Sequence, residues 1–393
     1  MSTTTPGGTT QTQAQPVRYA ALDGLRGLAS LAVLNMHVFG AFPFFYGAAR
    51  TWGEKALKWW PFTLLSDGRQ AVILFFCLSG FVLSLAWERE NRYWVFLRRR
   101  FWRLYIPFSA AVLLALAVNR FHVPPSAGIS AWGSQFWRVP LSWGQTVNTL
   151  LLVDPFRYNQ VNPVFWSLTF EARLSLLFPV LFWVARRASA YSRGTWFLGA
   201  VLAAYVLDLL FPTKHLNNWA DTLLYAIAFT VGIWLAGHRA QLQHLSRGWS
   251  RACLIGGLFA VGWQWDWIPG NWVIDARTSA CLSALLGSIL LLIWGMSGRD
   301  MGLLTSPPVR FLGRISYSLY LVHFPIAFSL LYLLWGKMPT VLLLTLMYGC
   351  VVLGAYVFWR SVERPATGRS RQIRGAPSSE AITPEAANQR EGG

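Results

Sequence analysis

Residues 340–359 read TVLLLTLMYGCVVLGAYVFW, twenty consecutive positions without a charged side chain. A helix of about 20 apolar residues is long enough to cross the hydrocarbon core of a bilayer. Polar segments separate this stretch from nine further apolar runs, at residues 22–44, 68–87, 104–120, 163–185, 195–211, 219–236, 252–266, 278–296 and 312–334. We therefore expect an all-α, polytopic membrane protein with about ten transmembrane helices.

The composition supports a membrane protein and argues against the soluble classes. Of 393 residues, 54% are hydrophobic and only 13% are charged, whereas soluble domains carry about 25% charged residues. The net charge of +18 raises the question of nucleic acid. The basic residues lie mostly between apolar runs, as in cytosolic loops of membrane proteins, so no nucleic-acid partner is expected.

The placement of basic residues predicts the orientation. With ten spans and a cytosolic N-terminus, 22 of the 34 Lys and Arg residues fall on the cytosolic side and 10 on the outer side. We therefore expect both termini in the cytosol of a multi-pass protein of the cell inner membrane. Residues 1–17 and 366–393 are polar and predict disordered tails around a membrane domain at 18–365. The first tail has no apolar segment typical of a signal peptide.

Four single cysteines predict neither a metal site nor a redox site. They lie in or beside separate apolar runs, with no pair at metal-ligand or redox spacing: Cys77, Cys253, Cys281 and Cys350. Small buried apolar residues are the expected interpretation, and no metal is expected.

Two ionisable residues share one face of the first apolar run. Arg26 and His37 are 11 residues apart, which on a helix places them within about 20° of one face and about 16 Å apart along the axis. An ionisable side chain deep in the membrane is a functional candidate. The alternatives are a neutral His37 bonded to a neighbouring helix and an Arg26 that reaches the headgroups.

A cluster of arginines precedes the third run, in the sequence FLRRRFWRLYIP. It contains Arg98, Arg99, Arg100 and Arg103. Several guanidinium groups on one or two helical turns can grip phosphate groups bidentately. The alternative is a topology signal that contacts anionic lipid.

Two further runs carry buried polar candidates. Glu171 and Arg173 lie within the fourth run but are two residues apart, so each needs a partner on another helix. A structural hydrogen-bonding role is the alternative for Glu171. His323 lies near the middle of the ninth run, where a histidine bonded to a backbone carbonyl is the alternative to a functional one.

The longest predicted outer loop, at about 121–162, contains Trp132, Trp137 and Trp143. Tryptophan is enriched at membrane interfaces. Interfacial anchoring is therefore the main interpretation, and stacking on sugar rings is the alternative.

Five segments together resemble the membrane-bound acyltransferase family 3, which includes O-antigen and exopolysaccharide O-acetyltransferases. The segments are LDGLRGLASLAVLNMH, FFCLSGFVLS, RRFWR, FWSLTFE and GRISYSLYLVHFPI. They contain the family's Arg–His pair at Arg26 and His37 and its RRxxR pattern at Arg99, Arg100 and Arg103. They occur in the family's order and cover about residues 18–364.

The resemblance implies an O-acetyltransferase that takes acetyl from cytosolic acetyl-CoA. It implies acceptor hydroxyls on a glycan, a lipid-linked glycan, or another cell-envelope or secondary-metabolite molecule. We assign Arg99, Arg100 and Arg103 to donor binding, and His37 to catalysis as a general base or acyl carrier. Arg26 would orient the donor and Glu171 would fix the His37 tautomer. Additional candidates for substrate or supporting contacts are Asp23, Trp166, Ser167, Tyr317 and His323.

Two other membrane classes compete with this interpretation. A transporter has a similar number of spans, but usually shows paired repeats with broken helices, and none is evident here. A membrane glycosyltransferase would favour acidic loop motifs, and this chain has only 16 acidic residues.

Overall fold

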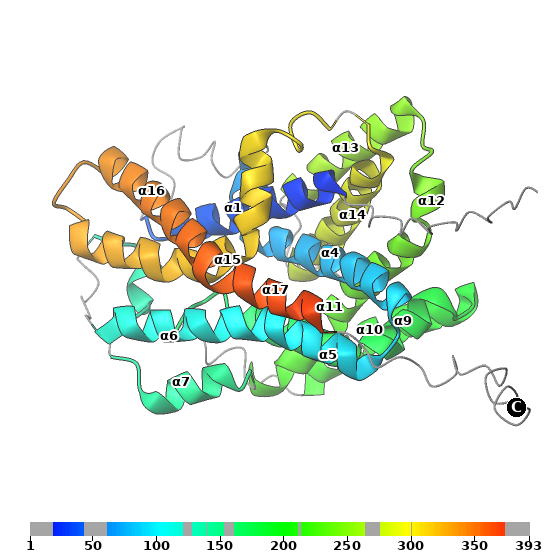
Figure 1. Cartoon of the computed structure of the whole chain (residues 1–393), viewed down its shortest axis with the longest axis horizontal. Coiled ribbons are helices and arrows are strands. Elements are labelled where there is room, and N and C mark those ends of the chain that lie inside the picture. The colour runs from blue at the N-terminus through cyan, green and yellow to red at the C-terminus, as the bar shows by residue number, and fades with distance from the viewer. Residues whose placement is uncertain are drawn as a thin grey trace, which may run out of the picture.

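The computed structural model describes residues 19–42, 61–120, 128–138, 140–152, 161–210, 214–263, 276–299 and 301–373. Within these ranges all regular structure is helical, which confirms the predicted all-α class (Figure 1). The longer elements are α1 (Ala20–Gly40), α4 (Gly68–Arg89), α5 (Tyr93–Arg100), α6 (Ile106–Arg120), α8 (Trp166–Leu176), α9 (Phe178–Arg186), α10 (Ala190–Leu210), α11 (Lys214–Gly237), α13 (Arg247–Gly262), α14 (Ala276–Ser297), α15 (Pro307–Leu334), α16 (Thr340–Phe358) and α17 (Arg364–Gln372). The other elements are η1 (Phe62–Leu65), η2 (Phe101–Tyr105), η3 (Gly133–Gln135), α7 (Trp143–Leu150), α12 (Arg239–Leu242) and η5 (Trp359–Glu363).

The predicted apolar runs fall on these helices, with one of them bent. The run at 163–185 forms two helices, α8 and α9, that meet at an angle of 68°. By length and apolar composition, five helices in the described residues can cross a membrane, or six if the bent pair counts as one span. The chain is thus a multi-pass membrane protein, while ten crossings and cytosolic termini remain predictions.

Helix α16 displays the surface expected of a helix that faces lipid. Val341 is 76% exposed and Leu353 is 63% exposed, although both are large apolar residues. The opposite side of the helix is buried, for example at Met347 and Val351. An apolar outer surface is stable only in an apolar solvent, so these side chains are consistent with contact with the bilayer.

Close packing of α1 against α15 brings two polar segments together. A Cβ atom at Gly27 would lie 2.5 Å from the backbone nitrogen of Gly313, so the two helices approach at glycine positions. Small residues allow this approach in membrane helices. As a result, Asp23 and Arg26 on α1 and Arg314 on α15 line the same cavity.

Two wide π-helical turns interrupt long helices near Asp23, Arg26 and Arg314. The turn η2 links α5 to α6, and the turn η5 links α16 to α17. A π turn adds one residue to the helix and so rotates the following residues by about 100°; such turns occur often at functional sites. η2 packs against α17, and η5 packs against α6.

The C-terminal boundary of the folded region differs from the prediction. Residues 366–372, which the composition assigns to a disordered tail, belong to helix α17. Contacts hold the helix in place, because Ser370 donates a hydrogen bond to the Arg99 carbonyl at 3.0 Å. The remainder of both predicted tails, 1–17 and 374–393, lies outside the described residues.

Candidate active site

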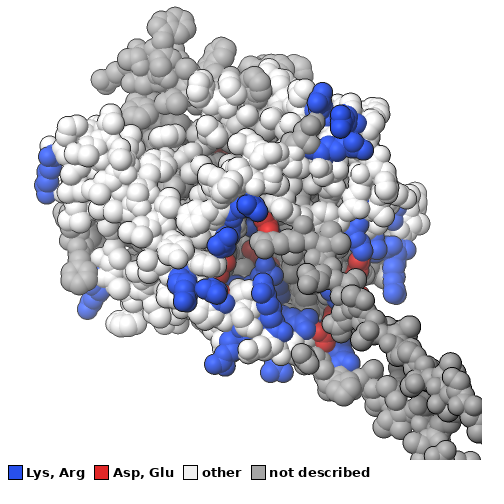
Figure 2. All heavy atoms as spheres, turned by 45° about the horizontal axis from the view of Figure 1, so that its top comes forward, with Lys and Arg blue, Asp and Glu red and all other residues white. Residues whose placement is uncertain are grey.

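A cavity of about 530 Å³ opens where α1, α4, α8, α15 and α17 meet. Figure 2 shows Lys and Arg side chains gathered around a hollow in this surface, with acidic side chains among them. The charged residues of the lining are Asp23, Arg26, Arg100, Arg103, Glu171, Arg314, Glu363, Arg364 and Arg371. Its hydroxyl-bearing residues are Ser79, Ser167, Ser316, Tyr317, Tyr320 and Thr367.

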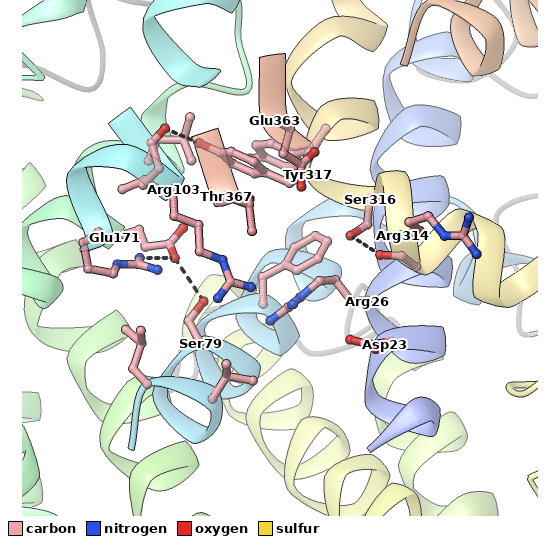
Figure 3. Close-up of a pocket in the computed structure, with 18 of the residues that line it drawn as sticks. Asp23, Arg26, Ser79, Arg103, Glu171, Arg314, Ser316, Tyr317, Glu363 and Thr367 are labelled. Carbon is pink, nitrogen blue, oxygen red and sulfur yellow. Dashed lines mark hydrogen bonds and ion pairs between the residues drawn. The ribbon is translucent and has the colours of Figure 1, made fainter. Parts of the chain in front are cut away.

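Positive charge exceeds negative charge in the cavity. Six arginines line it against three carboxylates. The Arg103 guanidinium is repelled by Arg26, Arg100 and Arg371 and is attracted by Glu363. Figure 3 shows the guanidinium groups of Arg26 and Arg103 together at the centre of the cavity. Like charges held together in this way favour an anionic ligand between them.

The predicted donor-binding arginines divide into two groups. Arg100 and Arg103 line the cavity, but Arg99 does not. Arg99 forms an ion pair with Glu90 at 2.6 Å and donates to the Ile373 carbonyl through Nε at 3.1 Å and Nη2 at 2.7 Å. The structure thus places Arg99 in contact with the end of α17 and away from the cavity.

The position of Glu171 contradicts the predicted contact with His37. The carboxylate pairs with Arg100 at 2.6 Å and accepts a hydrogen bond from Ser79 at 3.1 Å (Figure 3). His37 instead has its Nδ1 2.8 Å from the carbonyl oxygen of Val33, one turn earlier in α1. A backbone carbonyl therefore sets the His37 tautomer, and Glu171 is a cavity residue that orients Arg100.

Helix α1 carries the two members of the Arg–His pair to different depths. Arg26 lines the cavity. His37, three turns further along, is 4% exposed and lies outside the cavity lining. The predicted separation is thus realised, with the arginine in the charged region and the histidine buried among aromatic rings.

His37 and His323 form a buried pair. Their ring centroids are 5.1 Å apart, and His323 Nε2 lies 3.4 Å from His37 Nδ1. His323 Nδ1 is 2.9 Å from the carbonyl oxygen of Leu319. Because carbonyl oxygens only accept, each Nδ1 carries its proton, and each Nε2 is left with a lone pair. His323 is thus bonded to a carbonyl, as its structural interpretation predicted, and it also contacts His37.

The inner wall of the cavity leads toward this pair. Tyr320 lines the cavity, and its hydroxyl lies 2.6 Å from the Ser167 hydroxyl. The Tyr320 ring centroid is 6.3 Å from that of His323. The order from the charged cavity inward is therefore Tyr320, His323 and His37.

Aromatic residues of the predicted outer loop cover the other side of the histidines. The Trp132 ring lies 5.8 Å from the His37 ring. Trp137 is buried and donates from Nε1 to the Val161 carbonyl at 3.1 Å. These two tryptophans pack inward, whereas Trp143 is 73% exposed, as an interfacial anchor would be.

Of the remaining predicted site residues, three line the cavity and one does not. Asp23, Ser167 and Tyr317 line the cavity, and the Tyr317 hydroxyl donates to the Leu104 carbonyl in the π turn η2 at 2.8 Å. Trp166 does not line it and packs against Tyr225 with ring centroids 5.8 Å apart.

Sequence reasoning did not select four charged lining residues: Arg314, Glu363, Arg364 and Arg371. Arg314 lies in a segment that carries the resemblance, but the family patterns at Arg26, His37 and Arg99–Arg103 do not include it. The other three follow the last apolar run, where no apolar periodicity indicates folded structure. The seven-residue spacing of Arg364 and Arg371, which places both on one face of a helix, is the sequence feature that indicates their shared position.

Comparisons with known proteins agree with the geometry. A family model described as an acyltransferase domain matches residues 19–360. Acyltransferase MdmB of Streptomyces mycarofaciens is 30% identical over 332 residues, which cover 78% of this chain and 79% of the relative. No solved structure matches the chain.

Proposed function

Because the chain belongs to the acyltransferase family 3, we propose that it transfers an acyl group, in the expected case acetyl, from cytosolic acyl-CoA to an acceptor hydroxyl. The observation that carries the proposal is the cavity lined by six arginines, from which Tyr320 leads to a buried histidine pair. CoA carries several phosphates and cannot enter lipid. Its nucleotide can instead bind in an arginine-lined cavity at the membrane surface.

We assign binding of the acyl donor mainly to the cavity arginines that are not paired with Glu171. Arg26 and Arg103 have their guanidinium groups at the centre of the cavity (Figure 3). Arg100 is already paired with Glu171, so it retains only part of its donor capacity for a phosphate. We therefore expect Arg103 and Arg26 to contribute most to CoA affinity, with Arg100 held in place by Glu171.

The chemical step is assigned to His37. Its Nε2 lone pair can take the proton of an acceptor hydroxyl while that oxygen attacks the thioester carbon. The tetrahedral intermediate then expels the CoA thiolate, which receives the proton, and an ester is formed. The alternative is transfer through an acyl-histidine, in which Nε2 attacks the thioester carbon and the CoA thiolate leaves. The acceptor oxygen then attacks the acyl carbon and displaces the imidazole, and the hydroxyl proton passes to the thiolate.

The histidine pair lies between the charged cavity and the aromatic residues of the predicted outer loop. This arrangement supports separate access for donor and acceptor. On one side, Tyr320 separates His323 from the charged cavity. The aromatic residues of the outer loop lie against His37 through Trp132. We infer that the donor arm enters from the cavity and that the acceptor approaches near Trp132. The acceptor class we propose is a hydroxyl of a glycan, a lipid-linked glycan, or another cell-envelope or secondary-metabolite molecule at the inner membrane.

Transfer of radiolabelled acetyl from acetyl-CoA by the purified full chain in detergent tests this function. Label should move to a hydroxyl acceptor, or to water in its absence, and Arg103→Ala should raise the KM for acetyl-CoA. Arg98→Ala is a matched control, since Arg98 is exposed on α5 and does not line the cavity. Uptake of solute into proteoliposomes without any acyl transfer would instead identify a transporter and overturn the proposal.

A further inference from the structure

Helix α17 forms a wall of the cavity although it lies beyond residue 360, where the family match ends. The residues of α17 that line the cavity are Arg364, Thr367, Gly368 and Arg371. Their spacing of three, four and seven residues defines one face of a helix. The face that α17 turns toward the cavity therefore carries two arginines, one hydroxyl and a glycine.

The other face of α17 is used to attach the helix to α5 and η2. Ser370 is buried and donates to the Arg99 carbonyl, while Arg99 donates twice to the carbonyl of Ile373. Arg369 lies over the Trp102 ring at 5.8 Å. Four contacts thus fix the orientation of a polar helix whose sequence has no apolar stripe of its own.

The two arginines on the cavity face lack an acidic partner at ion-pair distance among the described residues. The Arg364 guanidinium lies 5.6 Å from the centroid of the Trp359 ring, and Arg371 is close enough to Arg103 to repel it. The nearby carboxylate of Glu363 is bonded to the amide and hydroxyl of Ser318. Placing Arg371 beside Arg103 costs free energy unless an anion shares them.

We propose that α17 completes the donor site, with Arg364 and Arg371 contacting the phosphates of the CoA nucleotide and with Arg99 as the residue that positions the helix. This inference rests on the proposed acyl-CoA function. It assigns ligand contacts to a segment outside the family match and reassigns the first arginine of the RRxxR pattern from ligand binding to support of α17. The shared chemistry of the site is a phosphate group, which a nucleotide or an anionic lipid headgroup can supply.

Binding of CoA to the purified full chain, measured by isothermal titration calorimetry in detergent, tests the proposal. Loss of one hydrogen-bonded charge from a phosphate contact should weaken CoA binding about 10- to 100-fold in Arg371→Gln and in Arg364→Gln. Arg98→Gln is the matched control, because Arg98 is exposed on α5 and does not line the cavity, and it should bind CoA as the wild type does. Affinity for S-acetylpantetheine, which has the thioester arm without the nucleotide, should be unchanged in all three variants.

The positioning role of Arg99 has its own measurement. Arg99→Gln should weaken CoA binding but not S-acetylpantetheine binding, and it should expose the peptide bond after Arg371 to trypsin in the absence of ligand. Arg371→Gln should weaken CoA binding but keep the helix attached to α5, so the bond after Arg369 should stay protected from trypsin in this variant and become exposed in Arg99→Gln. Equal protection of α17 in wild type and Arg99→Gln would remove Arg99 from the proposal.

The possible outcomes distinguish the inference from the function on which it rests. If Arg103→Gln weakens CoA binding while Arg371→Gln and Arg364→Gln behave like Arg98→Gln, α17 is not part of the donor site. If Arg371→Gln keeps CoA affinity but loses thermal stabilisation by phosphatidylglycerol, α17 binds lipid and the proposal is wrong. If the wild type itself binds neither CoA nor acetyl-CoA, the proposed function fails first.

Discussion

The buried histidine pair gives each ring a defined tautomer through its own helix. The carbonyls of Val33 and Leu319 fix the proton on Nδ1 in both residues. When Nε2 of His37 takes a proton, its Nδ1–H becomes a stronger donor to the Val33 carbonyl, and Nε2 of His323, 3.4 Å from the same nitrogen, turns a lone pair toward the positive ring as a second acceptor. His323 is thus suited to stabilise the imidazolium, the part that a carboxylate plays in other acyl-transfer sites.

Substitution of the two histidines should separate their roles. We expect His37→Gln to insert and fold normally but to lose about 10²–10⁴-fold in kcat, because an amide cannot take the proton. His323→Gln retains an acceptor for His37 and should lose less activity than His323→Leu, which keeps the apolar volume alone. Turnover of acetyl-CoA, normalised to folded protein by size-exclusion chromatography, gives the comparison. A folded His37→Gln variant with more than a tenth of wild-type turnover would exclude the general-base role.

Glu171 should behave as a partner of Arg100 and not as a proton acceptor. Glu171→Gln keeps an oxygen for Ser79 and Arg100 but removes the charge, so we expect kcat to stay within about tenfold of the wild type. Glu171→Leu leaves the Arg100 guanidinium in a partly buried position without this partner and should lower thermal stability. Initial rates and melting temperatures measured on the same preparations check both expectations. A loss of more than about 100-fold in the Gln variant with unchanged stability would return Glu171 to the chemical step.

At the level of elements, apolar patterning predicted where the long helices lie, and tertiary contacts decided the rest. The run at 340–359 forms α16 as expected, but the helix continues to Gln372 through contacts with Arg99 that no local pattern encodes. The break between α8 and α9 was likewise not predicted, since the apolar run continues through it. The site could be predicted at Arg26, Arg100 and Arg103, whereas the partner of Glu171 depends on which helices are neighbours.

The glycine contact between α1 and α15 gives an element-scale prediction. In an open helical position, Gly→Ala usually stabilises by about 1 kcal/mol, and Gly349 on α16 has nothing within 4 Å of an added Cβ. At Gly27 the added Cβ would meet backbone atoms of Gly313 at 2.5 Å, so the two helices must separate. We expect Gly27→Ala to destabilise the protein by about 1–3 kcal/mol and to lower acetyl-CoA turnover. Melting temperatures in detergent that are unchanged or raised at Gly27, as expected at Gly349, would show that this contact is not close in the protein.

At the scale of the whole molecule, both ends of the membrane domain meet at one cavity. Asp23 and Arg26 near the start of α1 line it together with Arg364 and Arg371 of α17. At its other end, α1 contacts the predicted outer loop, where the Ser130 hydroxyl donates to the Gly40 carbonyl at 2.7 Å. Because they line one cavity, the start of α1 and the cavity face of α17 lie on the same side of the molecule, and α1 runs from that side to the outer loop.

This arrangement makes a definite prediction for membrane topology. If the charged cavity faces the cytosol, a reporter fused after Arg374 should be cytosolic, and one inserted after Arg138 in the outer loop should be on the opposite side. The excess of 22 basic residues over 10 predicts that the side of the charged cavity is cytosolic. Because both ends of the domain line one cavity, they must lie on the same side of the membrane. Paired fusions of green fluorescent protein, active in the cytosol, and alkaline phosphatase, active outside, provide the measurement. Fusions that report the same side at both positions would contradict the path of α1 between the cavity and the outer loop. Fusions that report opposite sides with phosphatase activity after Arg374 would instead place the arginine cavity outside the cell, where it has no access to cytosolic acyl-CoA, and would end the proposed donor assignment.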